Sequence, residues 1–178
     1  MYDFVETAKL SGADGAALVN VSEVPFNAVF RQACEQNTCG KYGTCWCCPP
    51  DVGDIHTLIK KAKSYRHALV FQSIGQLEDC FDFDGMEAAA YKHFDITQRL
   101  ADILRPRLNA PLILGAGPCR FCECCAKITE EPCRVPQKAF ASLEAYGIAV
   151  SELAAAAELC YVNGQDTVTY FGGVLFNW

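Results

Sequence analysis

The sequence lacks any long apolar run. Its longest apolar stretches fall well short of the roughly 20 consecutive residues that a membrane-spanning helix needs. The opening MYDFVETAKL also lacks the basic segment followed by an apolar segment that marks a secretory signal. We therefore expect a cytoplasmic protein that does not bind to a membrane.

Positive charge is also scarce. The chain has 15 Lys and Arg residues against 21 Asp and Glu residues, which gives a formal net charge of −6. A protein that binds nucleic acid needs a basic patch to neutralise phosphates, and no long Lys/Arg run supplies one here. Nucleic acid is therefore not an expected partner.

Signatures of common catalytic and nucleotide sites are missing as well. The sequence contains no P-loop, no nucleophile elbow and no H-E-x-x-H motif. A G-x-G-x-x-G nucleotide loop starting at Gly115 is incomplete, because Arg120 stands where the third glycine belongs. The three histidines lie outside the cysteine-rich segments, and each is expected to be a surface or partly buried structural side chain: His56, His67 and His93.

Cysteine, in contrast, is abundant. Of the 12 cysteines, all but two fall into two groups of five. The first group is Cys34, Cys39, Cys45, Cys47 and Cys48, and the second is Cys119, Cys122, Cys124, Cys125 and Cys133. In a reducing cytoplasm, clustered thiols favour metal ligation or redox chemistry over structural disulfides. The two isolated cysteines, Cys80 and Cys160, are expected to be lone buried side chains, with a substitute metal ligand as the alternative.

The second group has the spacing of an iron-sulfur ligand set. Cys119, Cys122 and Cys125 follow the pattern C-x2-C-x2-C, and Cys133 comes later in the chain. A loop with this spacing can present three sulfurs to three irons of a 4Fe-4S cluster, while a more distant cysteine reaches the fourth. Zinc, the alternative, is usually held by two separate C-x2-C units or by mixed Cys/His pairs. Cys124 interrupts the pattern and is either an additional ligand or a small buried apolar residue.

The first group is less diagnostic. Cys34, Cys39 and Cys48 are candidate metal ligands, and Cys45 and Cys47 are additional candidates. If each group supplies four ligands, the protein carries two clusters, and a cysteine of one group can bind the cluster of the other.

Two arginines each follow a candidate ligand directly. Arg120 and Arg134 are candidate cofactor-binding residues, which could donate hydrogen bonds to cluster sulfurs or hold an anionic substrate. As surface side chains they would do neither. The acidic run from Glu78 to Asp84 is interpreted as a solvated loop and helix start, with a docking patch for a basic redox partner as the alternative.

The hydrophobic pattern predicts alternating strands and helices. Strands are expected at 15–24, 67–74, 111–117 and 167–176, with a short one after residue 147, and helices at 25–34, 55–62, 85–105, 136–146 and 152–160. The order predicts a mixed α+β fold of the α/β type, with one central mixed sheet, flanking helices and two cysteine-rich loops that bind clusters. The length of 178 residues suits one metal-binding domain spanning residues 1–178.

The cysteine motifs resemble an uncharacterised family of cysteine-rich, predicted metal-binding proteins. The resemblance covers the chain from about residue 30 to its end. It is carried by Cys34, Cys39, Tyr42-Gly43, Trp46, Cys48-Pro49-Pro50, the run from Gly117 to Cys125, Pro132-Cys133-Arg134-x-Pro136 and Ser142-Leu143-Glu144-Ala145-x-Gly147-Ile148. The resemblance implies a cysteine-bound metal or iron-sulfur centre in a cytoplasmic protein of the anaerobe type. Cys45, Cys47 and Cys124 are additions to the family pattern.

The leading hypothesis is an iron-sulfur protein with one or two 4Fe-4S clusters that passes electrons at low potential to a redox partner protein. One alternative is a cluster-dependent reductase with an open iron, because the cysteines outnumber the eight that two clusters need. The other is a zinc-binding interaction module or a scaffold that delivers its metal centre to another protein. The sequence does not decide whether the protein is an enzyme.

Overall fold

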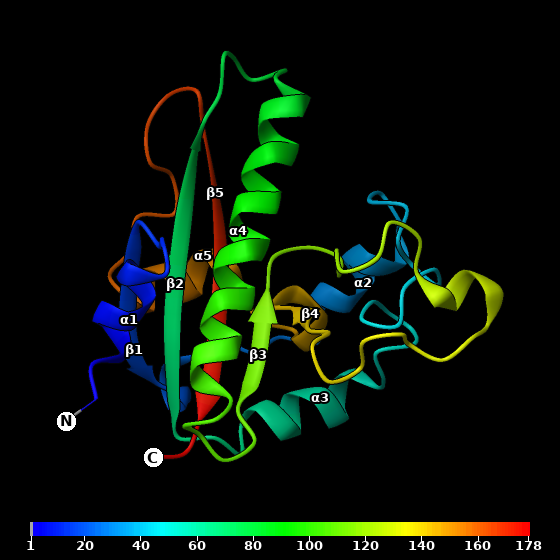
Figure 1. Ribbon diagram of the computed structural model, residues 1–178, viewed down its shortest axis with the longest axis horizontal. Coiled ribbons are helices and arrows are strands. Elements are labelled where there is room, and N and C mark those ends of the chain that lie inside the picture. The colour runs from blue at the N-terminus through cyan, green and yellow to red at the C-terminus, as the bar shows by residue number, and fades with distance from the viewer. Residues whose placement is uncertain (1) are drawn as a thin grey trace.

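A five-stranded mixed sheet forms the centre of the protein (Figure 1). The computed structural model describes residues 2–178. The strand order is β1-β2-β5-β3-β4. The strands are β1 (Gly15–Asn20), β2 (His67–Gln76), β3 (Leu112–Gly115), β4 (Ala141–Ser142) and β5 (Thr167–Phe176). All neighbours pair antiparallel except β3 and β4, which are parallel. The predicted mixed α+β fold with a central mixed sheet is therefore confirmed.

Helices cover both faces of this sheet. The α-helices are α1 (Phe4–Leu10), α2 (Phe30–Glu35), α3 (Ile55–Ala62), α4 (Phe83–Leu104) and α5 (Val150–Ala156), and short 3-10 turns lie at Val21–Glu23, Ala126–Thr129 and Glu144–Tyr146. Helices α1 and α4 pack on one face, and α3 and α5 pack on the other. In Figure 1, α4 lies in front of β5 and beside β2, and α5 lies behind these two strands.

The two long strands explain why both faces need cover. In β2, Leu69 and Phe71 point toward α4, while Ala68 and Val70 point toward the opposite layer. All four side chains are buried. A strand that is apolar on both sides is stable only when each side is shielded from water.

The strongest local patterns were predicted correctly. Helix α3 begins after Asp54, whose side chain accepts a hydrogen bond from the Thr57 N–H at 2.9 Å, as expected of an N-cap. Strands β2 and β5 and helix α4 also occur close to their predicted positions, and α4 ends at Leu104, two residues before Pro106.

The predicted helix at 25–34 is wrong in its first half. Helix α2 begins only at Phe30, because Phe26 lies in a β-bridge and a turn at Ala28 and Val29 follows it. Phe26 forms an antiparallel bridge with Ile148, and the Asn27 N–H donates to the Gly147 carbonyl at 2.6 Å. Pairing with a distant segment therefore overrides the helical pattern of the sequence. The same bridge is all that remains of the short strand predicted after Gly147.

The predicted helix at 136–146 is also wrong. Residues Ala141–Ser142 form β4 and pair with Leu114 and Gly115 of β3, and only a 3-10 turn follows at Glu144–Tyr146. The helix predicted at 152–160 is shifted, since α5 spans Val150–Ala156 and ends before Cys160.

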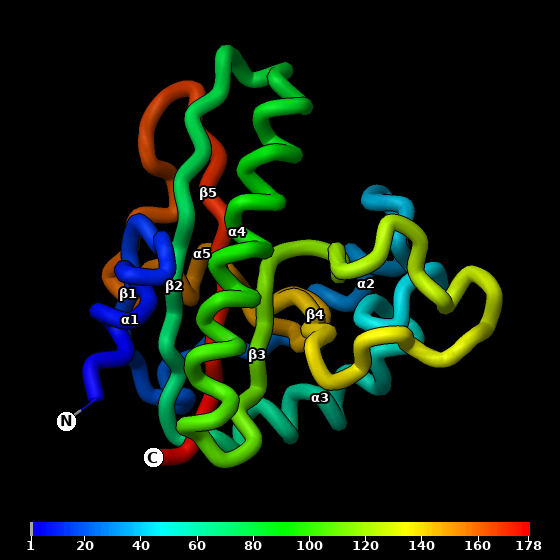
Figure 2. Tube along the Cα trace, in the orientation of Figure 1, coloured from blue at the N-terminus to red at the C-terminus, as the bar shows by residue number. Residues whose placement is uncertain are grey.

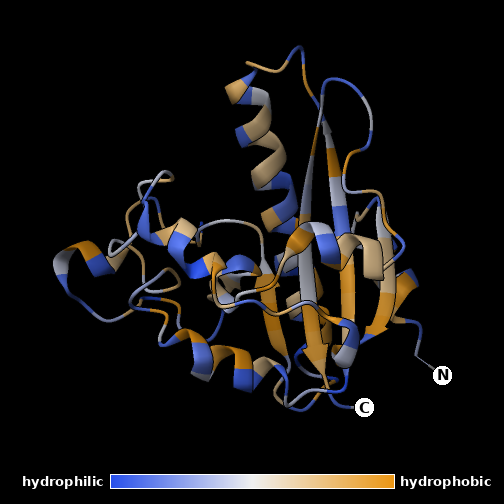
Figure 3. Ribbon diagram, turned by 180° about the vertical axis from the view of Figure 1, so that it is seen from behind, coloured by the Kyte–Doolittle hydropathy of each residue, from blue (hydrophilic) through white to orange (hydrophobic). Residues whose placement is uncertain are grey.

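Both cysteine groups lie in a lobe beside the β3–β4 edge of the sheet. This cysteine lobe consists of residues 34–53 and 116–140, which run next to each other and away from the sheet (Figure 2). The view from behind in Figure 3 shows the same arrangement, with apolar colour concentrated on the strands and mixed colour along the lobe. Among the helices of residues 2–178, none has the length and apolar character required to cross a membrane.

Candidate metal centre

Aromatic packing anchors the second loop of the lobe to the main layer. The loop leaves β3 at Gly115 and returns at Phe140, directly before β4. The ring of Phe121 lies 4.8 Å from that of Phe94 on α4 and 5.7 Å from that of Phe140. A Cβ atom on Gly115 would lie 2.8 Å from the Phe140 ring, so this glycine makes room for the anchor. The two ends of the loop, at Phe121 and Phe140, are therefore held beside α4.

Polar contacts tie the two loops to each other. The indole N–H of Trp46 in the first loop donates to the carbonyl of Glu131 in the second, at 2.9 Å. Lys127 Nζ lies 2.9 Å from Asp51 Oδ1 and 4.7 Å from the centre of the Trp46 ring. The side chains of Lys127 and Asp51 are only 13% and 15% exposed, so this ion pair is largely shielded from water. The contacts fix segments that are far apart in the sequence.

Six cysteines line one cavity between the loops, which we call the six-cysteine site. They come from both sequence groups: Cys45, Cys47, Cys119, Cys122, Cys125 and Cys133. Trp46, Ala126, Arg134 and Val135 complete the wall. Cys45 is fully buried, and the other five are partly buried. The cavity is largely enclosed and measures only about 20 Å³, so the thiols lie close together and would move apart to admit a cluster.

Three further cysteines line a second cavity, which we call the three-cysteine site. Its volume is about 170 Å³. The cysteines are Cys34, Cys39 and Cys48, and the remaining wall is formed by Lys41, Tyr42, Pro49, Gly117, Pro118, Ser142, Glu144 and Ala145. This cavity lies between the lobe and the turn that follows β4.

The thiols of the six-cysteine site affect one another's protonation. The neighbouring thiol of Cys47 is the largest cause that lowers the pKa of Cys45, and it also lowers the pKa of Cys119. The same interactions raise the pKa of Cys47, and the Cys119 thiol is the largest cause. The Cys45 thiol raises the pKa of Cys48. Negative charge is therefore favoured on Cys45 and Cys119. A thiolate is the form of cysteine that binds metal.

Backbone N–H groups contribute to this preference. Those of Phe121 and Phe140 help to lower the pKa of Cys119, after the larger effect of Cys47. In the three-cysteine site, burial raises the pKa of Cys34, and the nearby charge of Arg31 opposes this effect. Thiolate formation is thus more favoured at Cys119 than at Cys34.

The structure divides the cysteines differently from the sequence. Cys45 and Cys47 belong to the first group in sequence but line the site formed mainly by the second. Cys124 is exposed and lines neither site. Its carbonyl accepts a hydrogen bond from Arg134 Nη1 at 2.9 Å.

The two candidate arginines have different surroundings. Arg134 lines the six-cysteine site. Arg120 turns toward α4, where its guanidinium lies 4.7 Å from the Tyr91 ring and 3.8 Å from a Glu87 carboxylate oxygen. It lines an outer cavity rather than the six-cysteine site.

The isolated cysteines and one histidine depart from expectation. Cys80 and Cys160 are exposed, so the prediction that they are buried is wrong. Cys80 lies in the loop before α4, and Cys160 follows α5 in an irregular segment. His93 is fully buried on α4 instead of being partly exposed. None of these three residues lies in the cysteine lobe.

The set of donor atoms fits a metal that prefers sulfur. Both sites offer thiols and no histidine, a donor set that selects zinc, copper(I) or iron-sulfur clusters. Within residues 2–178, no three His, Cys, Asp or Glu side chains are placed to hold a single metal ion. The cysteines are candidate ligands because several of them line each cavity, although no three of them surround a single metal position within residues 2–178.

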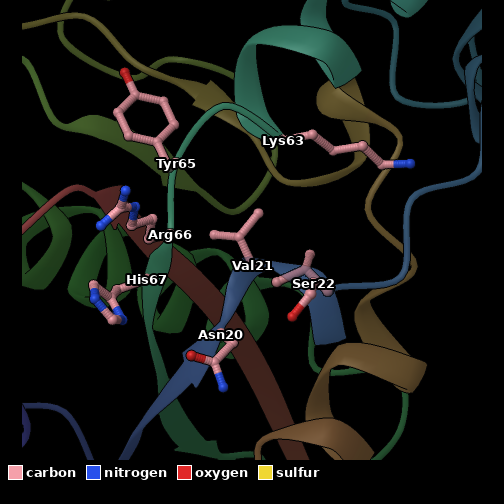
Figure 4. A pocket seen from close by; sticks show the side chains of 8 residues that line it. Asn20, Val21, Ser22, Lys63, Tyr65, Arg66 and His67 are labelled. Atoms are coloured by element: carbon pink, nitrogen blue, oxygen red, sulfur yellow. The ribbon is translucent and has the colours of Figure 1, made fainter.

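A surface cavity elsewhere has a different character. It measures about 730 Å³ and lies near the end of β1 and the start of β2. Figure 4 shows Arg66 and His67 on one side of it and Lys63 extending to the other. Because these basic groups do not converge and no cysteine lines the cavity, it is not a candidate metal site.

Sequence reasoning missed the residues that join the loops. Lys127 and Asp51 carry no motif, and nothing in their local sequence indicates that they form an ion pair. Trp46 belongs to the motif that carries the family resemblance, which was the available signal for its importance.

Comparison with known proteins identifies a family. The family described as "Predicted metal-binding protein (DUF2284)" matches residues 17–176, which include both loops of the cysteine lobe. No curated protein matches the chain. No solved structure matches it either.

Proposed function

Because the chain belongs to this family of predicted metal-binding proteins, we propose that it is an iron-sulfur protein with one or two 4Fe-4S clusters that transfers electrons to a protein partner. The first cluster occupies the six-cysteine site. One observation carries the proposal: six cysteines from two separate loops line a single cavity.

The number and spacing of the thiols favour a cluster over zinc. A structural zinc site uses four ligands, often including histidine, whereas this cavity has six cysteines and no histidine. Cys119, Cys122, Cys125 and Cys133 are the proposed ligands, since their spacing suits a chain that wraps around a cluster. Cys45 and Cys47 stand beside them as further sulfur donors.

The surrounding residues control solvent access and charge. The cluster supplies one-electron redox chemistry when it is bound. Trp46 forms part of the wall and shields the cysteines from water in part. Arg134 lines the cavity and adds positive charge, which favours the reduced form of the centre, although a Glu131 carboxylate oxygen 3.8 Å away offsets this charge in part. The net charge of −6, to which every cysteine thiolate adds, acts in the opposite direction and favours a low potential.

Metal and sulfide analysis tests this proposal. Protein purified without oxygen should contain about four irons and four acid-labile sulfides for each cluster. It should also show a broad visible absorption that bleaches on reduction, with a midpoint potential toward the low end of the roughly −700 to +450 mV range of iron-sulfur clusters. Colourless protein that contains zinc but no iron or sulfide would overturn the proposal.

Electron transfer requires its own measurement. The reduced protein should pass its electrons to an oxidised ferredoxin, and the transfer rate should depend on ionic strength if charged surfaces guide the encounter. If the protein contains iron but no such acceptor oxidises it, the proposed metal centre would stand and the proposed electron-transfer role would be contradicted.

A further inference from the structure

We propose that Cys34, Cys39 and Cys48 hold a second 4Fe-4S cluster, whose fourth iron binds a small anionic ligand from solution. This inference rests on the proposed function, because it assumes that cysteines of the lobe bind iron. It adds a ligand-binding site to a protein otherwise proposed to carry electrons only.

The three cysteines form a group distinct from the other six. They line one cavity together, and none of the cysteines of the six-cysteine site lines it. Their shared position in the wall of one cavity of about 170 Å³ places the three thiols near one another. The Cys48 N–H donates to the Cys45 carbonyl at 2.9 Å, which places the two sites side by side.

Arg31 holds the segments around this cavity in place. Its guanidinium donates from Nη1 to the Gly53 carbonyl and from Nη2 to the Ala145 carbonyl, each at 3.1 Å. These bonds join α2, the end of the first loop and the turn after β4. The cavity therefore has walls from three parts of the chain that are fixed relative to each other.

The ligand set contributed by cysteine is incomplete. A 4Fe-4S cluster needs one ligand for each iron, and within residues 2–178 this cavity is lined by three cysteines and by no histidine. The cluster itself would take up the cavity of about 170 Å³, so a further small ligand would have to reach its fourth iron from the adjoining outer cavity. Glu144, which also lines the cavity, is the competing protein ligand.

A second cavity gives this site access to solvent. This outer cavity measures about 610 Å³ and shares Cys39, Lys41 and Pro118 with the three-cysteine site. Its wall also includes Cys119 and Cys122 of the six-cysteine site. A ligand in this region would therefore lie between the two metal centres, where electrons from the first can reach it.

The charges around the entrance favour a small anion. Lys41 is exposed, lines both cavities and takes part in no ion pair within residues 2–178. Arg120 adds a second positive charge, which Glu87 offsets in part from 3.8 Å. Glu123 and Glu144 also line these cavities, so a large or multiply charged anion would be repelled. A compact, singly charged ligand that binds iron directly fits these groups best.

Cysteine variants and cyanide binding test the inference. We compare anaerobic wild-type protein with Cys34→Ser, Cys39→Ser and Cys48→Ser, using Cys80→Ser and Cys160→Ser as exposed controls outside the lobe. Wild type should contain about eight irons, and each lobe variant should lose about half of them. The controls should lose none. The EPR spectrum of the remaining cluster should match the corresponding part of the wild-type spectrum.

Carbon-13 cyanide should perturb only the EPR signal that is lost in Cys39→Ser. Lys41→Met should weaken cyanide binding by about fivefold, the effect of removing one exposed charge. Iron content that is unchanged in all three lobe variants would overturn the inference while leaving the proposed function intact. A changed resting EPR signal in Glu144→Gln, with cyanide bound only by that variant, would identify Glu144 as the fourth ligand and overturn the open site. Wild type without iron would instead contradict the proposed function itself.

Discussion

At the scale of single residues, one glycine determines how β2 and β5 fit together. Gly172 lies opposite Phe71 in the antiparallel register of these strands. A Cβ atom added to Gly172 would collide with the Phe71 ring, which is fully buried. The ring therefore occupies the space that a side chain at position 172 would need.

We expect Gly172→Ala to lower the free energy of unfolding by about 1 to 3 kcal/mol, because overpacking forces buried groups to move. Urea unfolding of the metal-bound protein, followed by circular dichroism, measures the change. Gly173→Ala is the matched control, since the nearest atom to its added Cβ, on Leu143, lies at 3.4 Å. Equal losses in the two variants would show that close packing at Gly172 is not the cause.

A buried histidine makes a second residue-scale prediction. Burial lowers the pKa of His93 to about 4, and the backbone of Phe171 only partly opposes this effect. Its Nδ1 lies 2.9 Å from Ser73 Oγ, and its ring lies 5.4 Å from the Phe71 ring. In the unfolded chain the same side chain has a pKa near 6.5.

The unfolded state therefore takes up a proton at His93 between pH 6.5 and 4, while the folded state does not. Stability should fall by about 3 kcal/mol as the pH drops through this range. Unfolding free energies measured from pH 7 to pH 4 should decline less steeply in His93→Gln than in wild type. Loss of metal at low pH affects both proteins, so the difference between them isolates the histidine. Parallel pH profiles would exclude His93 as the source.

At the scale of elements, the segments stabilised mainly by their own apolar pattern were predicted correctly, and a segment that pairs with a distant part of the chain was not. Helix α4 and strands β2 and β5 were predicted because their own sequences carry the apolar pattern that they bury. The segment 25–34 was assigned to a helix from the same kind of pattern, but its first half pairs with Ile148. No local sequence feature of Phe26 indicates a partner more than a hundred residues away.

For the same reason, the sequence did not predict how the cysteines divide between the two sites. The sequence identified the two cysteine groups, which the structure brings together in one lobe. It did not indicate that Cys45 and Cys47 would join the second group while Cys34, Cys39 and Cys48 would line a separate cavity. That outcome depends on how the two loops lie against each other, through contacts such as Trp46 with Glu131.

Two adjacent cysteines in the second loop provide a matched test of this division. Cys125 lines the six-cysteine site, whereas Cys124 is exposed. We expect Cys125→Ser to lose most of the metal in this site, and Cys124→Ser to keep the wild-type amount, because only the former removes a ligand. Iron analysis and the visible spectrum report the result. A similar loss of metal in both variants would contradict the assigned ligand set.

The contact between the loops should control how long the metal stays bound. Trp46→Phe keeps an aromatic ring but removes the N–H that donates to the Glu131 carbonyl. Losing a hydrogen bond of about 1 kcal/mol should speed metal loss to a chelator by about fivefold. Trp178→Phe, at an exposed position outside the lobe, is the control. Equal rates of metal loss in wild type and Trp46→Phe would show that this bond does not limit opening of the lobe.

At the scale of the whole molecule, the chain forms two parts: a sheet with its covering helices, which contains the apolar core, and the cysteine lobe, which contains the candidate metal sites. The sheet buries apolar side chains on both faces, against α1 and α4 on one side and α3 and α5 on the other. The cysteine lobe extends from one edge of this sheet and contains only short helical segments (Figure 1). Its arrangement depends on contacts between loops, and metal binding would add to them directly.

The central claim is that the cysteine lobe binds iron-sulfur clusters. Anomalous X-ray diffraction at the iron absorption edge, on crystals of anaerobically prepared protein, tests it most directly. The account predicts iron peaks inside the six-cysteine site, between the loops that carry Cys45 and Cys119. Zinc peaks in place of iron, or disulfide bonds among these cysteines without any metal, would contradict it.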